Sequence, residues 1–247
     1  RELGIDPLEL RHLNELRPGD ATLLGSEAKP SMRAVLDRVV EESGWNTKIS
    51  DAENLEADGW QLGRGVACGY WTGPGESASC SLRLNDDGSI QIVAGTVNLT
   101  GMSTALCQLT AEEFGISLDE VRYTTGDTDS APQSTAASGS KATRSVAQAI
   151  MSAAEDIREK IFSVASSKLE ADPADLVLED GKVSVASAPE RCLTLAEVAK
   201  IAPGVQGYII GSGETAKPPS CPIHTAQVAE VAVHPELGEV RVLKLYC

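Results

Sequence analysis

The chain has 247 residues, enough for one large domain or two small ones. Its 36 acidic and 21 basic residues give a formal net charge of −15, which argues against nucleic acids and anionic membrane surfaces as partners. No apolar run approaches the roughly 20 residues of a membrane-spanning helix. Aromatic residues make up only 4%, so the core must be built from Ala, Val, Leu and Ile.

The N-terminal quarter predicts helices joined by polar segments. Residues 1–16 carry a leucine stripe and predict a helix, with a break or a new start at Pro7. A turn is expected at residues 17–20 (RPGD), and an amphipathic helix over 31–43. Residues 44–60 are polar and acidic and predict a surface connection.

From residue 62 onward the pattern changes to strands and helices. Residues 63–71 (GRGVACGYW) read as a buried strand. Further along, we expect a hairpin over 77–97, a helix over 103–115, a strand over 117–127, a long helix over 142–169, a hairpin over 175–185, a short helix over 193–202, a strand over 207–213 and a hairpin over 224–246. Strands in hairpins with helices between them predict an α+β fold with mostly antiparallel sheets.

The cysteines and histidines predict no metal centre. The six cysteines form no C-x-x-C pair, and Cys68 and Cys107 are expected to be reduced thiols in apolar surroundings, which indicates a reducing compartment. The three histidines lack ligand spacing and are expected on the surface or in packing roles. Residue 1 falls inside a helical pattern and residue 247 ends a strand, so we expect a fragment of a longer protein.

Residues 126–146 (GDTDSAPQSTAASGSKATRSV) are the most informative stretch. Small and hydroxyl-bearing residues at the N-terminus of a helix bring backbone N–H groups and hydroxyls close to a bound group. The alternative is an ordinary Ser/Gly-rich loop with a good helix cap. Asp127 and Asp129 are expected to cap the next element or remain solvated. Glu214 is either a general base or an ordinary loop glutamate.

Five segments, in this order, resemble the molybdenum-binding large subunit of the xanthine dehydrogenase/aldehyde oxidase family, in its bacterial multi-subunit form. They are residues 2–20 (ELGIDPLELRHLNELRPGD), 63–71 (GRGVACGYW), 86–116 (DDGSIQIVAGTVNLTGMSTALCQLTAEEFGI), 126–143 (GDTDSAPQSTAASGSKAT) and 225–245 (TAQVAEVAVHPELGEVRVLKL). The resemblance implies that residues 1–60 are the end of a first molybdopterin-binding domain and a connector. Residues 61–247 would be a second such domain, incomplete at its C-terminus.

The resemblance also assigns cofactor contacts. The pterin-contacting run of the family falls on Thr135, Ala136, Ala137, Ser138, Gly139 and Ser140. Many members carry G-Q-G where this chain has Thr100-Gly101-Met102, so a contact at Thr100 and Gly101 must be made by the main chain. The family's catalytic glutamate follows a D-V-G-x-x-x-N-P segment. Glu214 lies upstream of that place, and the general base is expected beyond Cys247.

A molybdenum hydroxylase is the function that the resemblance implies. Such an enzyme hydroxylates an aldehyde or N-heterocycle with water-derived oxygen, using molybdenum on molybdopterin or on its cytosine dinucleotide form. Partner subunits would carry the 2Fe-2S clusters and FAD in a cytoplasmic dimer of heterotrimers. Two alternatives stay open: a non-catalytic scaffold of the same fold without cofactor, and an unrelated acidic binding module.

Overall fold

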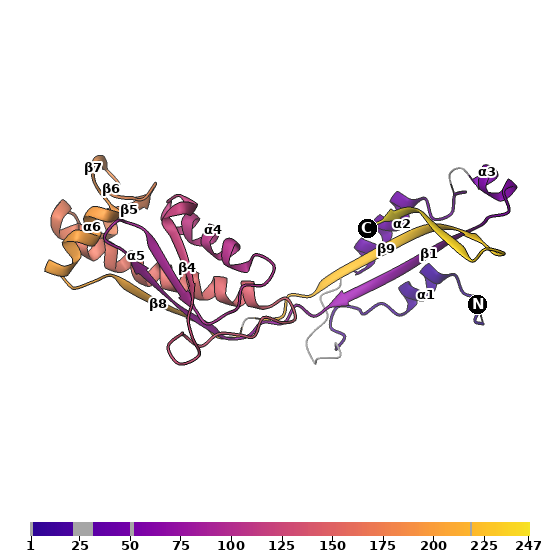
Figure 1. Ribbon diagram of the computed structural model, residues 1–247, viewed down its shortest axis with the longest axis horizontal. Coiled ribbons are helices and arrows are strands. Elements are labelled where there is room, and N and C mark those ends of the chain that lie inside the picture. The colour runs from indigo at the N-terminus through magenta and orange to yellow at the C-terminus, as the bar shows by residue number, and fades with distance from the viewer. Residues whose placement is uncertain (1, 22–31, 50–51, 218) are drawn as a thin grey trace. The chain divides into compact units, whose positions relative to one another are not determined.

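The computed structural model describes residues 2–21, 32–49, 52–217 and 219–247. Two compact units make up the chain, and each is described by itself. Unit 1 comprises Arg1–Thr72 and Pro222–Cys247, and unit 2 comprises Gly73–Cys221. Figure 1 shows their helices and strands as a ribbon and labels most of them.

Unit 1 is built on a three-stranded antiparallel sheet in the order β1-β9-β10. These strands are β1 (Gln61–Trp71), β9 (Ile223–His234) and β10 (Glu239–Tyr246). The predicted hairpin of β9 and β10 is confirmed, and its turn closes with Gly238 N donating to His234 O at 2.8 Å. The prediction that β1 is buried is wrong, because β1 is an edge strand and most of its residues are exposed or half-buried.

In the described part of unit 1 there are three helices. They are α1 (Pro7–Leu13), α2 (Met32–Ser43) and α3 (Ala52–Ala57). The predicted helix over 1–16 is shorter than expected, because the Asp6 side chain accepts hydrogen bonds from Leu8 N and Glu9 N and caps a new start at Pro7. Helix α2 packs its predicted apolar face on β9, while α3 replaces part of the expected irregular connection.

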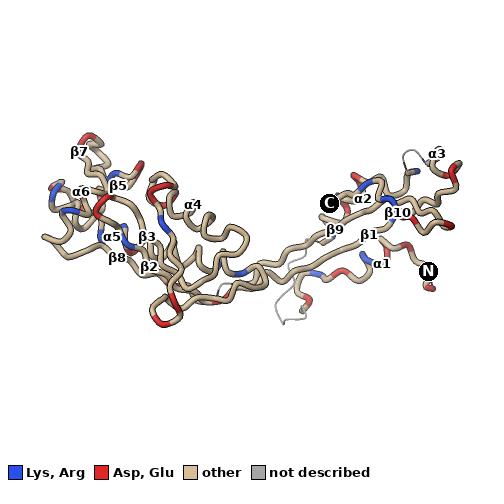
Figure 2. Tube along the Cα trace, in the orientation of Figure 1, with Lys and Arg blue, Asp and Glu red and all other residues tan. Residues whose placement is uncertain are grey.

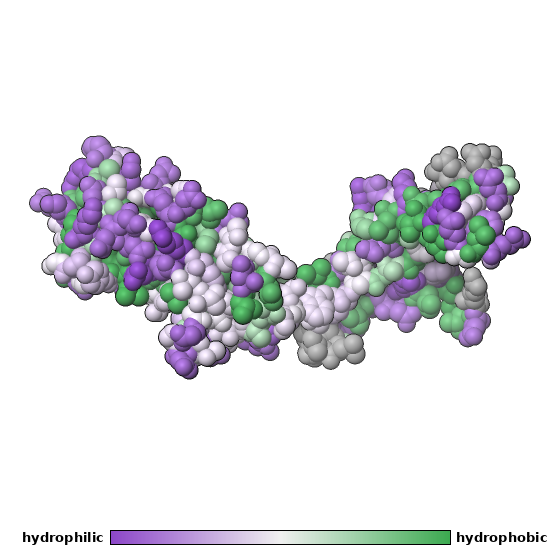
Figure 3. Space-filling model, in the orientation of Figure 1, coloured by the Kyte–Doolittle hydropathy of each residue, from purple (hydrophilic) through white to green (hydrophobic). Residues whose placement is uncertain are grey.

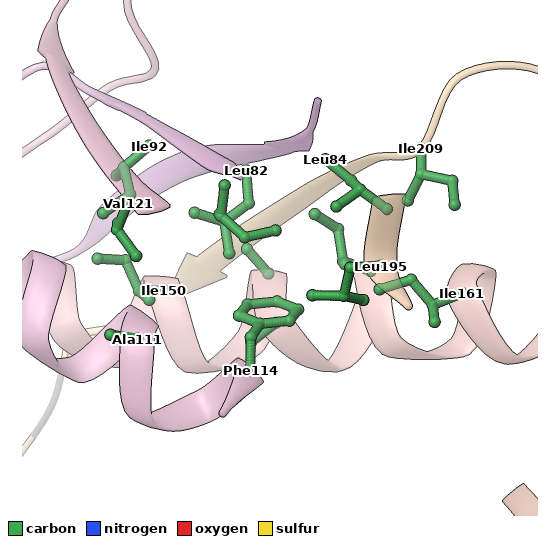
Figure 4. Packing of buried hydrophobic residues seen from close by; sticks show 14 of the residues in the cluster. Leu82, Leu84, Ile92, Ala111, Phe114, Val121, Ile150, Ile161, Leu195 and Ile209 are labelled. Atoms are coloured by element: carbon green, nitrogen blue, oxygen red, sulfur yellow. The ribbon is translucent and has the colours of Figure 1, made fainter. Parts of the chain in front are cut away.

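Unit 2 has a four-stranded sheet in the order β4-β3-β2-β8, covered by two helices. The elements are β2 (Ala78–Leu84), β3 (Ile90–Ala94), α4 (Met102–Phe114), β4 (Val121–Thr125), α5 (Ala142–Leu169) and β8 (Ile210–Thr215). Only β3 and β4 run parallel; the other pairs are antiparallel. Figure 4 shows the core between sheet and helices, where Leu82, Ile150 and Phe114 are fully buried.

A smaller antiparallel sheet completes unit 2. It contains β5 (Leu176–Glu179), β6 (Lys182–Val185) and β7 (Ala188–Thr194), followed by α6 (Leu195–Ile201). Short 3-10 turns lie at Leu118–Glu120, Pro173–Asp175 and Ala202–Gly204. Strand β7 was not predicted, whereas the β5–β6 hairpin and α6 were. The α+β class with mostly antiparallel sheets is therefore confirmed.

Acidic and basic residues occur along the chain in both units, as the coloured Cα trace of Figure 2 shows. Among the described residues, no helix combines the length and the apolar character needed to cross a membrane.

Candidate functional site

Two loops leave the sheet of unit 2 from the same edge. Because β3 and β4 are parallel, with Ala94 opposite Thr125, their carboxyl ends lie side by side. The chain after β3 runs through residues 95–101 into α4, and the chain after β4 runs through residues 126–141 into α5. Both predicted cofactor segments therefore start at one sheet edge, the kind of place where parallel strands commonly bind ligands.

The first half of the 126–141 loop is fixed by backbone contacts. Gln133 O accepts hydrogen bonds from Ser79 N at 2.8 Å and Ser79 Oγ at 2.6 Å, which ties the loop to the start of β2. A Cβ atom on Gly95 would lie 2.6 Å from Pro132 O. Only glycine lets the two loops approach this closely, so Gly95 allows the start of the first loop to lie against Pro132 of the second.

The second half of the loop exposes the predicted hydroxyls. Ser138 and Ser140 are exposed, whereas Thr135 is buried. Gly139 and Ser140 are both left-handed, with φ of 63° and 59°, directly before Lys141, the residue that precedes α5. No side chain of the described residues caps α5, so its first amides can bind an anionic or polar group.

A similar backbone turn precedes α4. Thr100 and Gly101 have φ of 56° and 81°, and Gly101 provides no side-chain cap. One amide of the first turn of α4 is satisfied, because Ser103 N donates to Asn98 Oδ1 at 3.1 Å. Two successive left-handed residues before a helix thus occur in both predicted cofactor segments. In Figure 3 much of this part of unit 2 is pale, the colour of intermediate hydropathy, with purple and green patches beside it.

Glu76 is a further side chain of this region, and its place there was not predicted from the sequence. Glu76 accepts hydrogen bonds from Thr135 Oγ1 at 2.5 Å and pairs with Lys141 Nζ at 2.7 Å. The hydrogen bonds from Lys141 and Thr135 hold the pKa of the Glu76 carboxyl below its usual value. The available signal was Lys141, the only basic residue between Arg122 and Arg144.

Two of the other acidic candidates, Asp127 and Asp129, lie in a turn, whereas Glu214 lies on a strand and not in the expected loop. Asp127 accepts from Ser130 Oγ at 2.8 Å and from the amides of Asp129 and Ser130, which lowers the pKa of its carboxyl. This confirms the expected turn-capping role, and Asp129 is exposed. Glu214 is exposed on β8, between Gly213, which faces α5, and Thr215.

Cysteine and histidine form no centre in the described part of the chain, where no group of three or more His, Cys, Asp or Glu residues could hold a metal ion. Cys68 is exposed on the edge strand β1, so its predicted burial is wrong, and Cys80 is buried instead. Burial raises the pKa of the Cys80 thiol to about 12. His224 and His234 pack against Tyr70 and Trp60, as expected of packing residues.

Comparison with known proteins agrees with this architecture. Residues 38–247 match the family of molybdopterin cofactor-binding domains. The xanthine dehydrogenase molybdenum-binding subunit of Escherichia coli O157:H7 is 32% identical over 202 residues, 77% of this chain and 26% of that protein. The aldehyde oxidoreductase molybdenum-binding subunit PaoC of Escherichia coli K12 is 26% identical over 243 residues, 98% of this chain and 32% of that protein.

A solved structure shows the same fold. Quinoline 2-oxidoreductase from Pseudomonas putida 86 superposes with a TM-score of 0.78 at 23% identity, covering 99% of this chain and 34% of that one. The chain therefore belongs to the molybdopterin cofactor-binding domain family of xanthine dehydrogenase and aldehyde oxidoreductase molybdenum-binding subunits. It spans about a quarter to a third of the length of these relatives.

Proposed function

We propose that this chain forms part of the molybdenum-binding subunit of a molybdenum hydroxylase and holds molybdopterin at the sheet edge described above. The contacts are made by residues 100–101 and 135–140. The observation that carries the proposal is the pair of left-handed turns, Thr100-Gly101 and Gly139-Ser140, each placed at the start of a helix.

The donors at this edge suit a phosphate-bearing, hydrogen-bonding ring system. The exposed Ser138 and Ser140 hydroxyls and the first amides of α5 donate to phosphate and ring atoms. Ala136, Ala137 and Gly139 are small enough for a large ring to approach the main chain. When bound, the cofactor supplies the redox chemistry that adds water-derived oxygen to an aldehyde or N-heterocycle. The residues of this chain bind it and fix its orientation.

Partner subunits complete the proposed enzyme. The names of the relatives describe them as molybdenum-binding subunits, so they assemble with other chains. We assign the 2Fe-2S clusters and FAD to such partners, in a dimer of heterotrimers. All six cysteines are free thiols, which supports a reducing compartment, the cytoplasm.

Substitution of Ser138 tests the cofactor assignment. In the full-length subunit co-expressed with its partners, Ser138→Trp should lower bound molybdenum and pterin by about tenfold, since a large side chain would fill the space of the ring. Metal analysis and pterin fluorescence after denaturation measure both. Ser163→Trp on the exposed face of α5 is the control and should leave both contents unchanged.

Three outcomes decide between the alternatives. Normal molybdenum content in Ser138→Trp would refute the loop assignment. A wild-type subunit without pterin would favour a non-catalytic scaffold. Release of cytidine monophosphate on acid hydrolysis would identify the cytosine dinucleotide form, and its absence would identify molybdopterin itself.

A further inference from the structure

The short segment before β2 carries Glu76, whose carboxylate contacts both ends of the 135–141 segment. Glu76 Oε2 accepts from Thr135 Oγ1 at 2.5 Å, and Glu76 Oε1 pairs with Lys141 Nζ at 2.7 Å. The backbone of the same residue is also held, because Glu76 N donates to Ser145 Oγ at 3.3 Å. One residue thus joins the beginning of the segment, its end and the first turns of α5.

The three residues that make these contacts differ in their exposure to water. Thr135 is 5% exposed and the Lys141 side chain 12% exposed, whereas the Glu76 side chain is 48% exposed. The carboxylate therefore lies at the surface and contacts one buried donor, Thr135, and one partly buried donor, Lys141. Shielded charge-assisted hydrogen bonds hold geometry better than fully exposed ion pairs.

The turn that carries Glu76 is itself fixed. Gly73 is left-handed, with φ of 53°, and a Cβ atom there would lie 1.8 Å from Cys221 O. Gly73 O accepts from Cys221 N at 2.9 Å and from Arg144 Nη1, on α5, at 3.5 Å. The Glu76 backbone is thus fixed between two other segments of unit 2.

The segment between the two contacts cannot hold its shape by packing alone. Ala136 and Ser138 are exposed and Ala137 is half-buried, so their small side chains bury little apolar area. An exposed run of small residues has many accessible backbone conformations, and restraints at its ends remove most of them.

We propose that Glu76 is a positioning residue that holds residues 135–141 in the shape presenting Ser138, Gly139 and Ser140 to the bound group. The inference rests on the proposed function, because it takes these three residues as cofactor contacts. Glu76 acts through Thr135 and Lys141 and does not itself touch the cofactor.

Hydrogen exchange separates this role from cofactor binding. The full-length subunit with its partners is prepared from a host that makes molybdopterin and from a host that cannot. In the cofactor-free protein, Glu76→Ala should speed amide exchange over residues 134–141 by about fivefold. Glu76→Gln keeps an acceptor for Thr135 and should show a smaller increase. Glu155→Gln, the same neutralisation at an exposed site on α5, should show none.

Pterin content gives the second measurement. In the cofactor-making host, Glu76→Ala should at least halve the bound pterin, and Glu76→Gln should retain more. Thr135→Val should reproduce the faster exchange near residue 135, since it removes only one of the two contacts. This variant keeps the test valid if Glu76→Ala folds poorly.

The outcomes distinguish the inference from the proposed function. Faster exchange in Glu76→Ala together with lower pterin content supports both. Exchange equal to that of the Glu155→Gln control, in a wild type that binds pterin, overturns the positioning role and leaves the proposed function standing. If Glu76→Ala exchanges faster but the wild-type subunit binds no pterin, the cofactor-presenting role and the proposed function are both overturned.

Discussion

A buried ion pair links helix α2 to the sheet of unit 1. The Glu230 side chain is 4% exposed and the Arg64 side chain 10% exposed, and the guanidinium donates two hydrogen bonds to Glu230 Oε1. Arg64 Nη1 also donates to the carbonyls of Gly44, Trp45 and Thr47, just beyond the end of α2. Arg64 therefore satisfies a buried carboxylate and the helix end together.

Removing one member of this pair should destabilise unit 1 strongly. Arg64→Met leaves the Glu230 carboxylate buried without its cation, which costs about 3–5 kcal/mol in comparable cases. Urea unfolding followed by tryptophan fluorescence measures it, because all three tryptophans, at positions 45, 60 and 71, lie in unit 1. The fluorescence midpoint should move to lower urea.

Two further variants test the cause. Arg64→Met combined with Glu230→Leu should regain much of the lost stability, because no unpaired charge remains buried. Arg38→Met removes an exposed pair with Glu42 and should change the free energy of unfolding by less than about 1 kcal/mol. Equal losses of unfolding free energy in the Arg64→Met and Arg38→Met variants would show that the buried pair contributes no more to stability than the exposed pair.

Strand β8 approaches helix α5 through glycines. A Cβ atom on Gly213 would lie 2.0 Å from Ala149 O and 2.3 Å from Ala153 N, both on the backbone of α5. Since Ala149 and Ala153 are themselves small and fully buried, strand and helix meet backbone to backbone. The G-x-G of this strand therefore serves packing of the unit that carries the proposed site.

Gly213→Ala should force β8 and α5 apart. The backbone of a helix cannot move aside as a flexible side chain can. We therefore expect the unfolding free energy to fall by about 1–3 kcal/mol. Thermal unfolding followed by circular dichroism at 222 nm measures it. Gly65→Ala in β1 is the matched control, because no atom lies within 4 Å of a Cβ placed there. A Gly213→Ala variant as stable as Gly65→Ala would contradict the close packing.

At the scale of elements, local pattern predicted most of unit 2 but not its tertiary contacts. The apolar period of α5 and the Asp-Gly turn between β5 and β6 are local signals, and both elements occur where the sequence places them. Strand β7, with exposed Glu190, Arg191 and Cys192, lacks such a signal. Glu76 lies 59 residues from Thr135, so no local pattern could join them.

The same division applies to the candidate site. The small-residue composition of residues 134–140 indicated a turn open to a ligand, since glycine adopts left-handed backbone without strain and serine favours turns through its hydroxyl. The parallel pairing of β3 and β4, which brings two loops to one edge, follows from nonlocal contacts. The prediction that β1 is buried was wrong for a related reason. An apolar strand is buried only if other elements cover it, and this depends on nonlocal contacts.

On the scale of the whole molecule, the two units differ in the size of their buried cores. Among the residues of unit 1 that the structure describes, the buried cluster contains Leu36, Val39, Ala226 and Val228. The cluster of unit 2 extends from Ala78 to Ile209 and includes the buried faces of α4, α5 and α6. Since stability grows with the apolar area removed from water, unit 1 should unfold first.

Two probes can follow the units separately in the 247-residue chain. Tryptophan fluorescence reports unit 1, and circular dichroism at 222 nm reports mainly unit 2, which contains the 28-residue α5. We expect the fluorescence midpoint at lower urea than the dichroism midpoint. Leu36→Ala should lower only the fluorescence midpoint and Ile157→Ala only the dichroism midpoint, because each substitution costs its own unit about 2–5 kcal/mol of unfolding free energy. Coincident curves that shift together in both variants would mean that the units fold as one cooperative body, with a single stability that neither core determines alone.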